Sequence, residues 1–208
     1  MHRAMVVDDH PFIRSTVKML LKKEKFEVVA EADNGWDGLQ LIREHLPDLV
    51  LLDISMPKMD GVDVLNRISD LGLPVKVLVL TSLSSAFFSM RCMRAGAAGY
   101  VSKTDDLAEL VKAISTVMSG DTFFPNLAIK SGRRNDVQAS ERELINSLSA
   151  RELTVFQQLA KGLSNKQIGE EMLLSSKTIS TYKSRVVEKL SVSSLIHLTD
   201  LARRNNVV

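Results

Sequence analysis

The stretch LVLLDISMPKMDG, residues 49–61, decides the fold of the first half of the chain. It opens on four consecutive apolar residues that are followed directly by an aspartate, Asp53. Uninterrupted apolar runs of this length are typical of strands that helices cover on both faces, as in parallel sheets. An amphipathic stretch of helical length follows over 62–71. The segment therefore predicts a strand, a loop and a helix of an α/β domain, with a carboxylate at the end of the strand.

Similar units repeat on either side of this stretch. The expected strands are 4–7, 27–32, 49–52, 75–80 and 99–101, and the expected helices are 11–25, 35–45, 62–71, 84–95 and 106–119. Five strands that alternate with five helices predict a doubly wound α/β domain with a five-stranded parallel sheet. The last helix has the clearest start, because Asp106 can cap it and Glu109 stands three residues later.

Length and composition describe an ordinary globular chain. The 208 residues are 45% hydrophobic and 25% charged, which excludes wholesale disorder. No apolar run approaches the roughly 20 residues that a bilayer requires, and Asp8 and Asp9 interrupt the N-terminus before a signal-peptide core could form. The single cysteine, Cys92, fits a reducing compartment. We therefore expect a cytoplasmic protein without membrane association.

Charge is distributed unevenly along the chain. Residues 1–120 carry 14 basic and 16 acidic side chains, whereas residues 121–208 carry 13 and 9. An acidic first part and a basic second part indicate two modules with different partners, and the partner expected for the basic module is a polyanion. We expect domains at 1–120 and 144–208. The polar segment 121–143 is predicted to be a linker, and SERELINSL, residues 140–148, is predicted to contain a short helix.

Polar side chains occur where parallel sheets hold their ligands, at the carboxyl ends of the strands. Asp8 and Asp9 end the first strand, Asp53 ends the third, Thr81 ends the fourth and Lys103 follows the fifth. Three carboxylates at one sheet edge would repel each other, and a hard divalent cation such as Mg²⁺ would relieve that repulsion. Lys103 offers a positive charge for a phosphoryl oxygen, and Thr81 offers a hydroxyl donor. A solvated strand end explains any one of these residues, but it is a poor explanation for all five.

The order and spacing of these residues resemble the receiver domains of response regulators over residues 3–120. Four motifs carry the resemblance: VVDDHP at 6–11, LVLLDISMPKMDG at 49–61, VLVLTS at 77–82 and GAAGYVSK at 96–103. A carboxylate that attacks a phosphoryl group agrees with this family, because the charge on the transferred oxygens needs a metal and a cation nearby.

The resemblance implies a role for each residue of the site. Asp53 would be the phosphoacceptor and form a 4-aspartylphosphate, while Lys103 would contact the phosphoryl group. Thr81 and Tyr100 would form the switch pair. The implied Mg²⁺ ligands are Asp8, Asp9, Asp53 and the backbone carbonyl of Ser55.

From Ser149 onward the sequence predicts four short helices with strong start signals. Ser149 and Ser164 each stand three residues before a Glu or Gln, which is the pattern of a capping box. Serine pairs at 175–176 and 193–194 offer caps for the other two helices. Only the residues LLSS separate the second helix from the third, and two short helices joined in this way predict a helix-turn-helix.

This half resembles the DNA-binding domain of LuxR/NarL-type regulators, through LSARELTVFQQLAKGLSNKQIGEEM at 148–172 and SSKTISTYKSRVVEKL at 175–190. A receiver followed by this domain is the arrangement of the NarL/FixJ class of transcription factor, and the wording SKTISTYKSR is most similar to the BvgA/EvgA-type branch. The resemblance implies a two-component response regulator that is phosphorylated by a sensor histidine kinase or a phosphotransfer protein. It also implies a homodimer on double-stranded promoter DNA, with RNA polymerase as a further candidate partner.

The third of these helices divides into two faces. Ile179, Tyr182, Val186 and Leu190 share one side, which we expect to pack against the other helices. The opposite side would enter the major groove, and two residues of the second helix would contact the DNA backbone. The expected DNA contacts are Asn165, Lys166, Lys177, Thr178, Ser180, Thr181, Lys183, Ser184 and Arg185. Ser180 and Ser184 depart from the basic residues that are common in relatives.

Two other function classes fit parts of the sequence. A Mg²⁺-dependent phosphatase also uses a strand-end aspartate, but it would need an acid to protonate the leaving group, and DISMP at 53–57 offers none. A regulator whose receiver-like half only contacts proteins would have a damaged acidic pair or lack Lys103, and neither is seen. We therefore expect a DNA-binding regulator that is no enzyme beyond catalysing its own phosphorylation and dephosphorylation.

Overall fold

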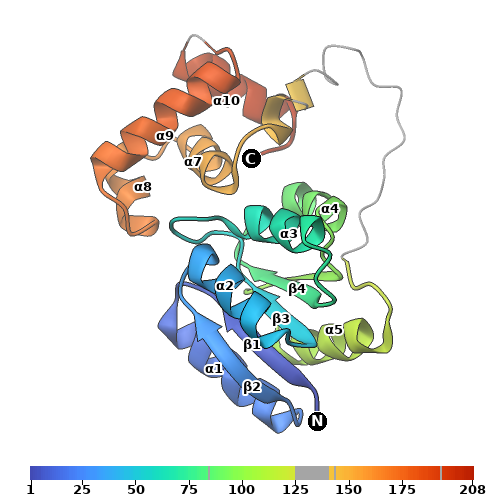
Figure 1. Cartoon of the computed structure of the whole chain (residues 1–208). Helices are drawn as coiled ribbons and strands as arrows, with labels where there is room; N and C mark the ends of the chain where they lie inside the picture. Colours follow the sequence, from blue (N-terminus) through green and yellow to red (C-terminus); the bar gives the residue numbers. More distant parts are fainter. Residues whose placement is uncertain (84, 125–140, 143, 193) are drawn as a thin grey trace. The chain divides into compact units, whose positions relative to one another are not determined.

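The computed structural model describes residues 1–83, 85–124, 141–142, 144–192 and 194–208. The chain divides into two compact units, Met1–Ala128 and Ile129–Val208, and each is described by itself (Figure 1). The predicted linker, 121–143, falls largely outside the described residues. Within the described part of the chain, no helix combines the length and the apolar character that crossing a membrane requires.

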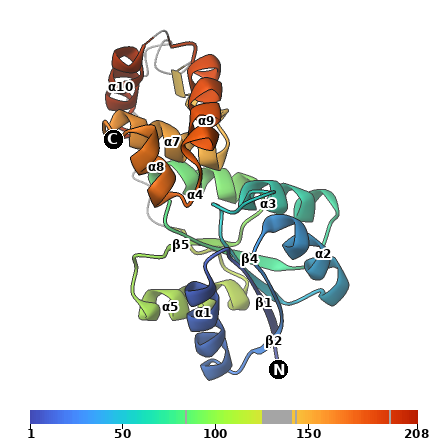
Figure 2. The same ribbon diagram turned by 90° about the vertical axis from the view of Figure 1, so that its left-hand side faces the viewer.

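The first unit is a parallel sheet with helices on both faces, which confirms the predicted doubly wound α/β fold. Its strands are β1 (Arg3–Val7), β2 (Glu27–Ala32), β3 (Leu49–Leu52), β4 (Lys76–Thr81) and β5 (Gly99–Ser102). Its helices are α1 (Pro11–Lys23), α2 (Gly35–His45), α3 (Gly61–Asp70), α4 (Ser85–Arg94) and α5 (Leu107–Ser119). The strand order is β2-β1-β3-β4-β5, with α1 and α5 on one face and α2, α3 and α4 on the other (Figures 1 and 2).

The apolar run of β3 is buried on both faces of the sheet, as its sequence predicts. All four of its residues, Leu49–Leu52, are at most 1% exposed. Leu49 and Leu51 belong to the core that α1 and α5 complete, while the alternate residues face the other layer because side chains alternate along a strand. Burial of this run holds β3 at the centre of the sheet.

Capping residues set the points at which helices begin. Asp106 accepts the backbone N–H of Glu109 and starts α5 as predicted, and Asn34 and Asp60 start α2 and α3 in the same way. The end of α1 differs slightly from the prediction: it lies two residues earlier, because Lys25 adopts left-handed backbone with φ 62°.

The second unit contains the predicted helices. They are α7 (Ala150–Ala160), α8 (Asn165–Glu171), α9 (Ser176–Lys189) and α10 (Leu195–Arg204). Ser149 and Ser164 open capping boxes as predicted, and Ser175 and Ser194 cap α9 and α10. α7 packs against α9 and α10, and α8 packs against α9, so the helix-turn-helix rests on α7.

Polar contacts tie this unit together. The carboxylate of Glu152, on α7, accepts the Ser149 N–H at 2.8 Å and the Lys189 ammonium of α9 at 2.7 Å. Burial opposes ionisation of Glu152, but the hydrogen bonds from Lys189 and Ser149 outweigh it and lower the pKa.

Helical backbone at 141–142 and 144–146 agrees with the short helix predicted there. Its Glu141 contacts Arg204 at 2.8 Å and Asn205 at 2.7 Å.

The turn between α8 and α9 depends on Gly169. A Cβ at this position would lie 2.6 Å from the carbonyl oxygen of Leu174. The Leu174 N–H donates to the Gly169 carbonyl at 2.8 Å, which draws the chain back over the end of α8. Only a residue without a side chain fits beneath so close a backbone.

We expect Gly169→Ala to destabilise the second unit. The overlap with backbone costs about 1–3 kcal/mol and should exceed the ~1 kcal/mol that Ala gains over Gly in a helix. Hydrogen exchange of the slowest amides in α7 measures the change, and Glu170→Ala, an exposed neighbour, is the control. Equal protection in the two variants would contradict this account of the turn.

Candidate functional site

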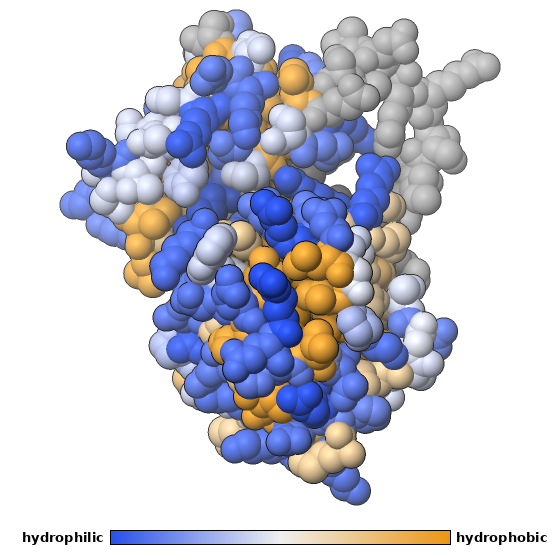
Figure 3. Space-filling model, viewed as in Figure 1, coloured by the Kyte–Doolittle hydropathy of each residue, from blue (hydrophilic) through white to orange (hydrophobic). Residues whose placement is uncertain are grey.

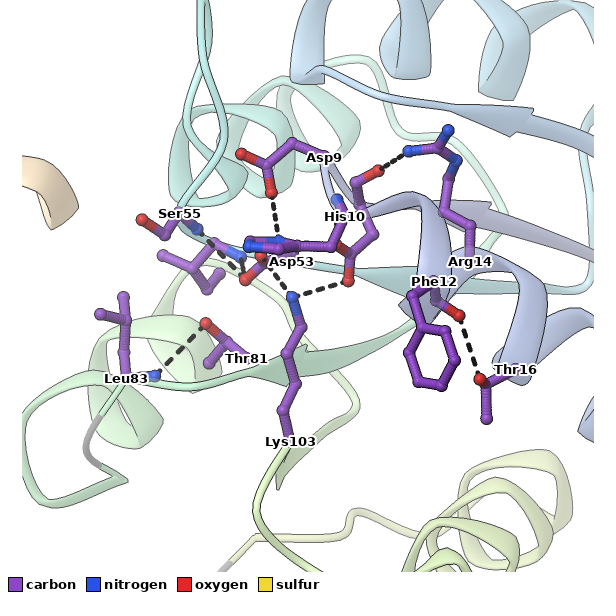
Figure 4. Close-up of polar contacts among 12 residues, drawn as sticks. Asp9, His10, Phe12, Arg14, Thr16, Asp53, Ser55, Thr81, Leu83 and Lys103 are labelled. Atoms are coloured by element: carbon purple, nitrogen blue, oxygen red, sulfur yellow. Dashed lines mark hydrogen bonds and ion pairs between the residues drawn. The ribbon is translucent and has the colours of Figure 1, made fainter. Parts of the chain in front are cut away.

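Five polar residues meet at the carboxyl edge of the sheet in the first unit (Figure 4). They are the residues that the sequence predicted: Asp8, Asp9, Asp53, Thr81 and Lys103. Backbone hydrogen bonds hold the strand ends in register. The Asp53 N–H donates to the carbonyl of Val7 at 2.8 Å, and the Lys103 N–H donates to the carbonyl of Thr81 at 2.9 Å.

Lys103 lies between two buried carboxylates. Its Nζ is 2.7 Å from Asp8 Oδ2 and 2.7 Å from Asp53 Oδ2, and the three side chains are 8%, 3% and 2% exposed. Burial and the nearby Asp53 carboxylate raise the pKa of Asp8. Burial alone would lower the pKa of Lys103, but the carboxylates of Asp53 and Asp8 outweigh it and raise that pKa.

The orientation of Asp53 is set by its surroundings. Its Oδ1 accepts the backbone N–H of Ile54 at 2.6 Å and that of Ser55 at 3.2 Å, while Oδ2 faces Lys103. The loop after β3 folds back over Asp53 and requires glycine at position 61, because a Cβ on Gly61 would overlap the carbonyl oxygen of Asp53. The carboxylate is therefore held with one oxygen on backbone donors and the other toward a cation.

The acidic cluster fits a hard metal ion. Asp8, Asp9, Asp53 and His10 each offer a ligand atom, and these atoms lie within 4.8 Å of one another. Asp9 Oδ1 is buried and lies 2.7 Å from Nδ1 of His10. Burying three carboxylates so close together is costly unless cations meet them. Carboxylate oxygens are the ligands that Mg²⁺ prefers.

His10 is the member of this cluster that sequence reasoning missed. The signal was its position directly after the acidic pair, at the end of β1.

The two predicted switch residues share a neighbour, Leu83. The hydroxyl of Tyr100, on β5, donates to the Leu83 carbonyl at 2.7 Å, and the Leu83 N–H approaches Thr81 Oγ1 at 3.5 Å. Tyr100 is 1% exposed, and Thr81 is fully buried. Burial raises the pKa of Tyr100 far above its usual value, so the phenol keeps its proton and remains a donor.

The predicted DNA contacts lie on α8 and α9 of the second unit and differ in exposure. Ile179, Val186 and Leu190 are buried as predicted, and Tyr182 is half-buried. Hydrophilic side chains dominate the visible surface over α9, whereas an apolar patch lies at the end of α8, where Leu173 is 83% exposed (Figure 3). The exposed members of the predicted set are Lys166, Lys177, Ser180, Thr181, Ser184 and Arg185, and the half-buried ones are Asn165, Thr178 and Lys183.

Comparison with known proteins places both units in families. Residues 4–115 match the response regulator receiver domain, and residues 146–202 match the luxR family of bacterial regulatory proteins. The chain is 49% identical over 206 residues to the virulence factors putative positive transcription regulator BvgA of Bordetella pertussis, covering 99% of each. It is 32% identical over 204 residues to the DNA-binding transcriptional activator EvgA of Escherichia coli, covering 98% of each.

A solved structure shows the same fold along the chain. The structure of two RcsB dimers bound to two parallel DNAs matches 97% of this chain and 98% of its own, with a TM-score of 0.57 and 24% identity. The protein thus belongs to the response regulators that join a receiver domain to a LuxR-type helix-turn-helix. It is a DNA-binding transcription regulator of a two-component system, which confirms the predicted class and branch.

We expect Lys103→Met to lower the free energy of unfolding of the first unit by about 3–5 kcal/mol at about pH 7, because it leaves two buried carboxylates without their cation. The deficit should shrink toward about pH 4, where Asp8, whose pKa is already raised, takes up a proton. In the unmodified chain the pKa of Lys103 is raised. Its contribution to the free energy of unfolding is therefore complete below the usual lysine pKa of ~10.4, and it is lost only as pH rises through the raised pKa.

Denaturant unfolding followed by tryptophan fluorescence measures this, because Trp36, the single tryptophan of the chain, lies on α2. Lys22→Met, at the exposed end of α1, is the control. A Lys103→Met deficit that is the same at both pH values would show that the carboxylates do not cause it.

Proposed function

We propose that this response regulator accepts a phosphoryl group on Asp53 from a sensor histidine kinase or a phosphotransfer protein. The position of Lys103 Nζ, 2.7 Å from both Asp8 and Asp53, carries the proposal. It places a cation beside the acceptor carboxylate, where the transferred phosphoryl oxygens would lie. The receiver would catalyse only its own phosphorylation and dephosphorylation.

The acidic cluster supports a magnesium site with Asp8, Asp9, Asp53 and the carbonyl of Ser55 as ligands. His10 receives no ligand role in this proposal, because Mg²⁺ takes oxygen ligands. When bound, Mg²⁺ neutralises charge on the phosphoryl oxygens.

In the transfer step an Asp53 carboxylate oxygen attacks phosphorus. The new O–P bond forms as the P–N bond to the donor histidine breaks, and the imidazole leaves. The backbone N–H groups of Ile54 and Ser55 hold one carboxylate oxygen, which orients the nucleophile. The ammonium group of Lys103 would contact the transferred phosphoryl oxygens while it remains paired with Asp8.

The contacts of Leu83 support a route from the site to β5. A phosphoryl oxygen on Asp53 would accept the hydroxyl of Thr81 and draw it inward. The Leu83 N–H approaches that hydroxyl, and the Leu83 carbonyl holds Tyr100. Movement of the segment from Thr81 to Leu83 would therefore reach Tyr100 directly.

Asp53→Asn should abolish phosphorylation. A small phosphodonor with Mg²⁺ should label the unmodified chain, and EDTA should prevent the labelling, because the acceptor and the cation are both required. Intact-protein mass spectrometry detects the added phosphoryl group. Asp63→Asn, on the exposed side of α3, should be labelled normally. Labelling that persists in Asp53→Asn would assign the acceptor role to another residue.

For the second unit, the exposed surface of α8 and α9 supports binding to double-stranded promoter DNA through the predicted residues. α9 would lie in the major groove, and Asn165 and Lys166 at the start of α8 would contact the backbone. Two copies are expected, because helix-turn-helix proteins bind paired half-sites, and RcsB, of the same fold, has been solved as dimers on DNA. We place this regulator in the cytoplasm, with RNA polymerase as a further partner.

Charged and uncharged residues of α9 should contribute differently to DNA binding. Lys183→Ala should weaken binding to all sequences alike and reduce the salt dependence by ~1 unit, as expected for one lost phosphate contact. Thr181→Ala or Ser184→Ala should instead change the preferred operator, at about 1–3 kcal/mol per affected base pair. The Thr181 and Ser184 hydroxyls already donate to the carbonyls of Lys177 and Ser180, which leaves their lone pairs for base amines.

Binding titrations on operator and scrambled duplexes at several salt concentrations measure both effects. The assignment of the two groups is wrong if Lys183→Ala loses only the operator while Thr181→Ala weakens both duplexes equally.

A further inference from the structure

Arg14 contacts the backbone of the acidic site from the first turns of α1. Its Nη1 donates to the carbonyl oxygen of Asp8 at 2.8 Å (Figure 4). The side chain is 18% exposed, so water competes little for this bond. The contact arises because α1 begins at Pro11, directly after the end of β1, and its fourth residue therefore lies beside the strand end.

The guanidinium of Arg14 is oriented in turn by Glu31. Arg14 Nε lies 3.6 Å from Glu31 Oε2, and Lys18 Nζ lies 2.7 Å from the same oxygen. Glu31 is on β2, paired with Val6 of β1. Arg14 thus links α1, β2 and the end of β1.

The carbonyl that Arg14 holds belongs to the peptide between Asp8 and Asp9. The other polar groups of Asp8 also have partners: its N–H donates to Ala32 at 3.1 Å, Oδ1 accepts the His10 N–H at 2.9 Å, and Oδ2 meets Lys103 at 2.7 Å. The orientation of this peptide sets the direction in which the Asp9 side chain leaves the backbone. Asp9 belongs to the acidic cluster, and its buried Oδ1 lies 2.7 Å from Nδ1 of His10.

We propose that Arg14 is a positioning residue for the magnesium site, acting by holding the peptide that joins its two N-terminal carboxylates. The inference rests on the proposed function, because it requires Mg²⁺ at Asp8 and Asp9. Groups that orient metal ligands without touching the metal commonly change metal affinity about 10–100-fold when removed. A merely structural role would change stability and leave the affinity unaltered.

The test is a Mg²⁺ titration of the full-length, isotopically labelled chain, followed by NMR of its backbone amides. Arg14→Met should raise the Kd for Mg²⁺ about 10-fold or more, and Arg14→Lys should recover part of the affinity. Glu31→Gln, which keeps Arg14 but removes its anionic partner, should raise the Kd to a smaller extent. Lys18→Met is the matched control, because Lys18 shares Glu31 but does not contact Asp8, and its Kd should equal that of the unmodified chain.

Arg14→Met with an unchanged Kd would overturn the inference, as would Lys18→Met with an equal loss of affinity. Thermal unfolding in EDTA shows whether each variant is folded. If Arg14→Met does not fold, the comparison of Glu31→Gln with Lys18→Met decides, and equal affinities there would overturn the inference. An unmodified chain that binds no Mg²⁺ would remove the proposed function as well. Normal binding by the unmodified chain and by Arg14→Met would remove the role of Arg14 alone.

Discussion

One ammonium group, that of Lys103, meets two buried carboxylates at 2.7 Å each, and the rest of the site is arranged around this contact. Removing two carboxylates from water is unfavourable unless a cation compensates them. Asp8 follows β1, Asp53 follows β3 and Lys103 follows β5, so the compensation exists only when the sheet is assembled. One lysine against three acidic side chains, with Asp9 as the third, leaves an excess of negative charge. That excess is the reason for which we propose a divalent cation at this edge.

Hydrogen bonds extend from this contact in two directions within the first unit. On one side, Leu83 joins Thr81 to Tyr100, and the Tyr100 N–H donates to the carbonyl of Phe123 at 2.7 Å, after α5. On the other side, Arg14 joins the end of β1 to β2 through Glu31. The first direction offers a path by which phosphorylation could change the surface. The second holds the end of β1, where we propose the metal ligands, so the two sides of the site would have different physical tasks.

The second unit separates stability from recognition along one helix. The buried side of α9 packs on α7, where Lys189 pairs with Glu152. Its exposed side combines lysine and arginine with short hydroxyl residues. The cations can supply affinity through phosphates, a term that is independent of sequence. Hydroxyls such as that of Thr181 must approach bases closely to discriminate between them. A tight turn at Gly169 joins α8 to α9 and keeps these two helices in contact.

The sequence by itself determined the order of strands and helices, because apolar runs and capping residues act locally. It also determined that Asp53 and Lys103 share one edge, because the carboxyl ends of parallel strands meet there. Only the tertiary structure decided that Lys103 bridges two carboxylates, that Arg14 holds the Asp8 carbonyl, and that Glu141 contacts the end of α10. Such contacts join residues up to 64 positions apart. Periodicity cannot encode them, since they depend on side-chain directions that are set only when separate elements pack together.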